Sequence, residues 1–116
     1  NGKRICSEMT VRRSIQQFGS LQIDRTMMIP MRFSAGMMLG GNPVGLWGQQ
    51  SRHAFGHIGL INKLCWADAA QDISVSLLNT GIPIVGHHLP ALARFVYTVC
   101  DRFPLIPENR RPLVAA

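Results

Sequence analysis

The hydrophobic and polar positions near the N-terminus predict one amphipathic helix. Between residues 8 and 17, apolar side chains fall roughly on one stripe, and arginines and glutamines fall opposite them. This is the spacing of a helix with a single apolar face. Ser7 is a good N-cap, and Glu8 stands in the first turn, where the helix dipole favours a carboxylate. Gly19 is positioned as a C-cap. We therefore expect a helix from about residue 8 to residue 17.

The middle of the chain predicts short strands separated by turns. Residues 31–39 are mostly apolar and follow the break at Pro30, so they predict one strand. The Gly-Gly-Asn-Pro sequence at 40–43 then predicts a turn. Residues 42–52 are glycine-rich and predict an irregular loop that Trp47 anchors in the core. This segment therefore separates one strand from those that follow.

Two further strands are predicted after this loop. Residues 54–66 end in an apolar stretch, and residues 67–72 form a connection of hairpin length. Ile73–Leu77 alternates with period two, as a strand with one buried face does. Cys65 is expected to be a small core residue. Asp68 is expected to cap backbone N–H groups in the turn. The simplest topology for these strands is an antiparallel β-meander.

A second helix is predicted from about His88. Apolar residues recur there at steps of three and four and give an apolar face that can pack on a sheet: Leu89, Leu92, Val96, Val99 and Phe103. Pro90 suits the first turn, and Pro104 ends the helix. We expect an α+β fold, in which an antiparallel β-meander packs against an N-terminal and a C-terminal helix. Residues 1–104 would form one domain, and residues 105–116 a loose tail.

Composition and charge narrow the possible partners. The charged fraction is 16%, low against about 25% in a typical protein. This fits a segment whose faces are covered by more protein, or a subunit that buries a face in an oligomer. The net charge of +6 raises nucleic acid as a partner. However, the twelve basic residues never cluster beyond two and have no interleaved aromatic residues, so a solvated basic surface is favoured over a nucleic-acid site.

The spacing of the cysteines and histidines and the length of the apolar runs predict no cofactor, no metal site and no membrane segment. The three cysteines are far apart and lack C-x-x-C spacing, which favours reduced thiols and leans towards the cytoplasm. His53 and His57 are four residues apart on a predicted strand and have no third ligand, so no metal site is expected. No apolar run reaches the ~18 residues that span a bilayer, and no signal peptide is recognisable.

Short motifs between residues 55 and 81 resemble a known family. They are Phe55-Gly56-His57-Ile58-Gly59, Trp66-Ala67-Asp68 and Asn79-Thr80-Gly81. In this order they resemble the C-terminal part of the beta-lactamase-related serine hydrolases, which include class C beta-lactamases and penicillin-binding-protein-like esterases. There, a strand with Lys-Thr-Gly or His-x-Gly precedes a W-x-D hairpin turn and a second strand that ends in Asn. Residues 1–11 resemble the family's entry into a helix, and the resemblance covers about residues 1–103.

The resemblance implies acyl transfer on an ester, an amide or a beta-lactam. His57 would occupy the place of the family's lysine and help to bind or polarise a small acyl substrate. Gly59 would let the substrate approach the strand edge. The N–H of Leu60 would be one half of an oxyanion hole. Ile58 departs from the usual Thr or Gly, and the bulky Ile58 and Leu60 are expected to narrow the substrate edge.

The catalytic set is incomplete in this sequence. The family takes its nucleophile from Ser-x-x-Lys and a partner from Tyr-x-Asn, and neither motif occurs among the 116 residues. The resemblance therefore implies a preceding segment of the same domain that supplies the nucleophile, with this chain as the C-terminal portion. Two alternatives stay open: a non-catalytic binding or regulatory module derived from the same fold, and a basic nucleic-acid-binding module.

Overall fold

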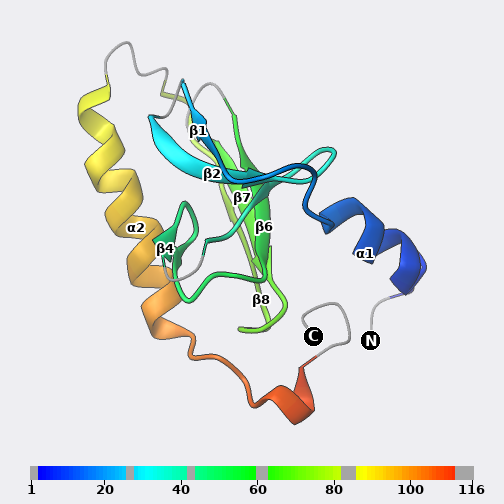
Figure 1. Cartoon of the computed structure of the whole chain (residues 1–116). Helices are drawn as coiled ribbons and strands as arrows, with labels where there is room; N and C mark the ends of the chain where they lie inside the picture. Colours follow the sequence, from blue (N-terminus) through cyan, green and yellow to red (C-terminus); the bar gives the residue numbers. More distant parts are fainter. Residues whose placement is uncertain (1–2, 26–27, 42–43, 60–62, 82–85, 112–116) are drawn as a thin grey trace.

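Strand pairing follows the order of the chain. The computed structural model describes residues 3–25, 28–41, 44–59, 63–81 and 86–111. Within them, one antiparallel sheet has the strand order β1-β2-β3-β6-β7-β8 (Figure 1). The strands are β1 Gln22–Asp24, β2 Ile29–Phe33, β3 Met38–Leu39, β6 Ala54–Ile58, β7 Leu64–Asp68 and β8 Ile73–Leu77. A small hairpin of β4 Val44–Gly45 and β5 Gly48–Gln49 is inserted between β3 and β6. The α+β class and the antiparallel meander are thus confirmed.

Two segments predicted as single strands are hairpins. Residues 31–39 divide into parts of β2 and β3, because Ser34 closes a turn with Met37: its N–H donates to the Met37 carbonyl (2.9 Å) and its Oγ accepts from the Met37 N–H (3.0 Å). Residues 54–66 divide into β6 and most of β7, and the Gly59 N–H donates to the Lys63 carbonyl (2.7 Å). In both segments apolar residues stand on either side of the reversal, which is why each was predicted as a single strand.

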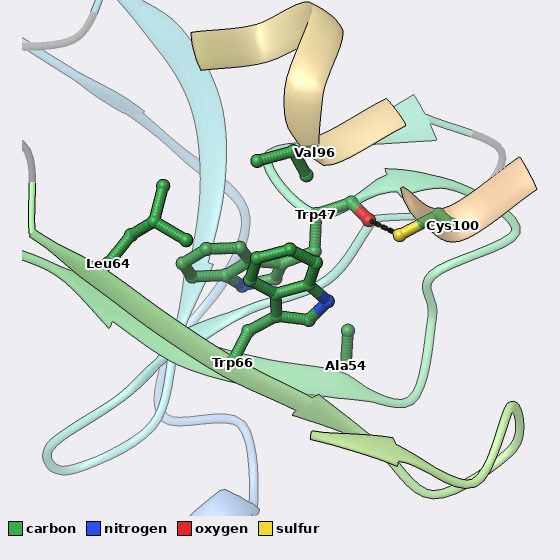
Figure 2. Packing of buried hydrophobic residues seen from close by; sticks show 6 residues of the cluster. All are labelled: Trp47, Ala54, Leu64, Trp66, Val96 and Cys100. Atoms are coloured by element: carbon green, nitrogen blue, oxygen red, sulfur yellow. Dashed lines mark hydrogen bonds between the residues drawn. The ribbon is translucent and has the colours of Figure 1, made fainter. Parts of the chain in front are cut away.

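The core lies between the β6–β8 part of the sheet and the C-terminal helix. Trp47 has no exposed surface and its ring stacks on that of Trp66, with centroids 5.7 Å apart and an angle of 14° between the planes (Figure 2). Phe95 meets Trp66 edge-on at 6.4 Å. The Trp47 indole N–H donates to the Met38 carbonyl (2.9 Å), which satisfies the polar end of a buried tryptophan. Trp47 is therefore a core anchor, as predicted.

Helix α2 (Leu89–Arg102) packs directly on the inserted hairpin. A Cβ atom added to Gly48 would lie 3.0 Å from the Cβ of Cys100, and Gly48 has a φ of +103°, a conformation that favours glycine. The Cys100 thiol donates to the Trp47 carbonyl (2.8 Å; Figure 2). Val96 and Cys100 are buried, whereas Leu89 and Phe103 at the ends of the predicted apolar stripe are partly exposed. The helix thus buries the middle of its stripe.

Helix α1 (Glu8–Ile15) has the predicted N-cap but not the predicted packing. The Ser7 Oγ accepts from the Thr10 N–H (3.1 Å). The helix ends two residues earlier than expected and its C-cap is Gln16, so the prediction of Gly19 as the C-cap is wrong. None of its residues is buried, and it projects from the edge of the molecule away from α2 (Figure 1). The expectation that an N-terminal helix packs against the sheet is therefore wrong for the described residues. Amphipathic spacing provides an apolar face but does not specify a partner for it.

The segment after α2 returns to the turn between β7 and β8. The Ile106 N–H donates to the Ala70 carbonyl (2.8 Å), and a short 3-10 turn follows at Glu108–Arg110. Arg111 pairs with Glu108 (3.6 Å). Of the tail expected to be loose, residues 112–116 lie outside the described part of the structure.

Candidate functional site

Strand β6 carries the central motif at a place where its pairing changes. Strand β3 pairs with β6 only at Phe55 and Gly56. Strand β7, in contrast, pairs with all of β6: His57 lies opposite Cys65, and Ile58 lies opposite Leu64. From His57 onward, β6 has no partner in β3. At His57 and Ile58, therefore, β3 does not cover the edge of β6 that faces it.

His57 is exposed on the face of the sheet opposite α2. Its neighbour Gly56 is buried on the α2 side, and side chains alternate along a strand. The His57 Nδ1 lies 2.9 Å from the carbonyl of Ile58. Because a carbonyl only accepts, the proton is on Nδ1 in this contact, and Nε2 is left as an acceptor. Cys65 and Ser76 follow His57 in register across β7 and β8 and are also exposed.

The two glycines of the motif differ in what the protein requires of them. A Cβ atom at Gly56 would collide with the Cys65 carbonyl and the Trp66 Cβ across the β6–β7 pair. The sheet itself therefore requires glycine at that position. At Gly59 a Cβ atom would meet only Lys63, at 3.4 Å or more, which is ordinary contact. The described part of the protein thus leaves room beside Gly59.

The other motif residues fall into two groups. Ile58 packs against the hydrophobic core, so the expectation that its side chain narrows the substrate edge is wrong. Leu60, the expected oxyanion-hole donor, lies outside the described residues. Cys65 is exposed, in contrast to its predicted place in the core, because Trp66 takes the inward position and period two turns Cys65 outward.

Asp68 and its turn hold the sheet to α2. Asp68 is 1% exposed, and its Oδ1 accepts from the Ala70 N–H (2.7 Å), as the predicted turn cap would. Burial raises the pKa of this carboxyl, against its hydrogen bonds to Ala70 and Gln71. The Gln71 side-chain amide donates to the carbonyls of Cys100 (3.0 Å) and Phe103 (2.6 Å) at the end of α2. In this structure the W-x-D motif has structural roles.

A second cluster was missed by the sequence analysis. Among the described residues, four arginines and His53 line a cavity of about 460 Å³ between α1 and the sheet. The arginines are Arg12, Arg13, Arg32 and Arg52. The interpretation of the basic residues as scattered does not hold for this group. Arg12 and Arg13 are neighbours in α1, whereas Arg32 belongs to β2 and Arg52 to the segment before β6. No local sequence period relates these three segments, so the sequence carries no signal that they converge.

Two further kinds of feature are absent from the described ranges. There, no three histidine, cysteine or acidic side chains are grouped to hold a metal ion, and no helix has the length and apolar character needed to cross a bilayer.

The chain was also compared with known proteins. It matches no family model, and the comparisons with curated proteins and with solved structures found no match.

Proposed function

We propose that this chain supplies the sheet portion of a serine hydrolase that acts by acyl transfer on an ester, an amide or a beta-lactam. The observation that carries the proposal is the position of His57. Its ring is exposed on the face opposite α2, where β3 no longer pairs with β6. A substrate can thus approach both the imidazole and the adjacent strand edge. This is the role that the motif resemblance assigns to the strand.

His57 binds and orients the acyl substrate in this proposal. The Nδ1–H group donates a hydrogen bond to the Ile58 carbonyl. The unprotonated Nε2 can therefore accept a hydrogen bond from a substrate N–H or O–H. When the ring is protonated, Nε2 donates to a substrate carbonyl or carboxylate. The attack itself comes from a serine hydroxyl activated by an adjacent base. The developing oxyanion is held by backbone N–H groups, among which the resemblance assigns that of Leu60.

The space beside Gly59 supports a ligand at this edge. Unlike Gly56, Gly59 has neither a clash nor a positive φ that would require glycine. Side chains at this position would, however, occupy the space through which a substrate backbone reaches the strand.

Covalent labelling and turnover test the proposal together. The natural gene product that carries these 116 residues would be treated with a fluorophosphonate, and the modified residue located by tandem mass spectrometry. We expect a serine adduct and turnover of p-nitrophenyl butyrate or nitrocefin. We expect His57→Ala to lower kcat/KM by about 100-fold, and the control Ser74→Ala, exposed on β8, to have no effect. Absence of both adduct and turnover would reject the hydrolase.

The alternative is a non-catalytic binding or regulatory module on the same sheet. It draws on one sequence observation: the 116 residues contain neither Ser-x-x-Lys nor Tyr-x-Asn. The same labelling experiment separates the two functions, because a binding module forms no serine adduct but still loses ligand affinity when the β6 edge is altered.

A further inference from the structure

The cavity between α1 and the sheet, here named the arginine cavity, has an unbalanced charge. Its described lining includes Arg12, Arg13, Arg32, Arg52 and His53 and contains no aspartate or glutamate. Like charges brought together repel one another, so such a group costs stability unless an anion or solvent compensates it. The arrangement is therefore suited to a negatively charged ligand.

The four guanidinium groups differ in the partners that they already have within the protein. Arg12 is paired with Glu8 (3.1 Å). Arg32 donates from Nε to Gln17 Oε1 and from Nη1 to the Gly40 carbonyl, each at 2.8 Å. Both acceptors are neutral, so these bonds orient Arg32 and leave its charge uncompensated.

Arg13 and Arg52 complete the charged lining. Neither guanidinium makes an ion pair or a hydrogen bond with any residue in the described part of the chain. A guanidinium presents a planar fork of N–H donors that matches a carboxylate or a phosphate. The cavity thus offers two forks to an incoming oxyanion, beside an Arg32 that is already held in place.

His53, the chain neighbour of Arg52, lies in the same electrostatic environment. Its pKa is lowered, first by burial and then by the positive charges of Arg52, Arg111 and Arg32, while Asp68 acts in the opposite direction. An anion placed in the arginine cavity would reduce the effect of these cations and raise the pKa of His53 towards its ordinary value.

A larger, mostly apolar cavity adjoins the arginine cavity. It has a volume of about 850 Å³, and Leu21, Ile29, Met31, Leu46 and Tyr97 are among its lining residues. Arg32, Leu39 and Arg52 line both cavities. The two spaces therefore meet at a pair of arginines. Ligand sites of this size are usually apolar with a few placed polar groups.

We propose that the two cavities form one binding site for a small amphiphilic anion. The oxyanion head, a carboxylate or a phosphate monoester, lies between Arg13 and Arg52, and an aliphatic body extends past Leu39 into the apolar cavity. Arg52, which lines both cavities, holds the head where they meet. This site rests on the cavities alone and is independent of the proposed hydrolase function.

Isothermal titration calorimetry with matched probes tests the site. The probes are decanoate, decyl phosphate, decanol as the neutral chain, and acetate as the head without a chain. We expect decanoate or decyl phosphate to bind at least tenfold more tightly than decanol and acetate, and added NaCl to weaken that binding. The better of the two anions identifies the head group. Equal affinity for decanol and both anions would overturn the proposal, as would binding of acetate as tight as that of decanoate.

Two substitutions and one spectroscopic readout locate the binding. Arg52→Gln, which alters the wall shared by both cavities, is expected to weaken anion binding about tenfold and leave decanol unchanged. Arg102→Gln is the control, because Arg102 is exposed at the end of α2 and lines neither cavity. In the unaltered protein, decanoate is expected to raise the pKa of His53, followed by NMR of its ring protons. Equal effects of the two substitutions, or an unchanged His53 titration on binding, would contradict the site.

Discussion

The two ends of the chain use similar apolar residues with different results. In the C-terminal region, here residues 44–103, apolar side chains of β5–β8 and α2 meet and bury Trp47, Trp66 and Val96. In the N-terminal region, residues 3–25, no side chain is buried. Large apolar residues remain exposed there: Ile5, Met9, Phe18, Leu21 and Ile23.

The difference lies in the availability of partners. Helix α2 packs on the hairpin of β4 and β5 so closely that Gly48 is needed beneath Cys100. Helix α1 has a sound cap and an i,i+4 ion pair between Glu8 and Arg12, but these local contacts contribute only tenths of a kcal/mol to about 1 kcal/mol. Most of the stability of a helix in a protein comes from tertiary packing. We therefore expect the C-terminal region to carry the cooperative unfolding transition.

The largest expected effect is on the stacked tryptophans. Trp47→Ala removes a fully buried ring and its hydrogen bond to Met38, and should lower the free energy of unfolding by about 3–5 kcal/mol. Urea denaturation followed by circular dichroism measures it. Phe18→Ala in the N-terminal region, where the side chain is 81% exposed, should stay within about 0.5 kcal/mol. Similar losses from both substitutions would remove the distinction between the regions.

A smaller effect is expected at the glycine of the β6–β7 pair. Gly56→Ala places a methyl group against the Cys65 carbonyl, so the strands must separate at an expected cost of about 1–3 kcal/mol. The matched control is Gly36→Ala, since nothing lies within 4 Å of an added Cβ there. Thermal denaturation of both variants compares them. If Gly56→Ala were as stable as Gly36→Ala, the close β6–β7 pairing would be incorrect.

The turn that joins the sheet to α2 should show a pH-dependent effect. Asp68→Ala loses the cap on Ala70 and should cost about 1 kcal/mol. The pKa of Asp68 is raised in the folded state above the ordinary 3.8, so the folded protein binds this proton more tightly than the unfolded chain. Its contribution to stability therefore increases as the pH falls through the folded pKa and is complete below 3.8.

Comparison with Asp68→Asn isolates that titration. Asparagine keeps a side-chain oxygen for the Ala70 N–H but has no carboxyl to titrate. Urea denaturation between pH 7 and pH 3 should show the original protein gaining stability relative to Asp68→Asn as the pH falls. A difference between the two proteins that is constant over this range would contradict the raised pKa.

The smallest expected effect is at the cap of α1. Ser7→Ala removes the hydrogen bond to the Thr10 N–H, which stabilises the helix by about 1 kcal/mol. Because α1 has no buried residue, this loss should be local and leave global unfolding unchanged. Hydrogen exchange should quicken at the α1 amides and stay the same in β6–β8. A lower global stability in this variant would mean that α1 is part of the cooperative core.

Local features of the sequence were sufficient for several elements. Strand β8 has the predicted bounds Ile73–Leu77, because alternating apolar residues define a strand with one buried face. Ser7 begins α1, and α2 starts next to Pro90, because capping and proline geometry depend on neighbouring residues alone. The role of Asp68 as a turn cap was predicted for the same reason.

Only the tertiary structure decided which residues come together. Whether Cys65 is inside or outside depends on Trp66 stacking on a loop residue nineteen positions earlier in the chain, Trp47. The convergence of Arg13, Arg32 and Arg52 depends on where α1, β2 and the segment before β6 meet. The sequence by itself determined the class of the fold, the bounds of β8 and the N-cap of α1, since these follow from local periodicity and hydrogen bonding. The exposed α1 and the arginine cavity required the structure, because packing partners and charge convergence arise between segments with no fixed sequence spacing.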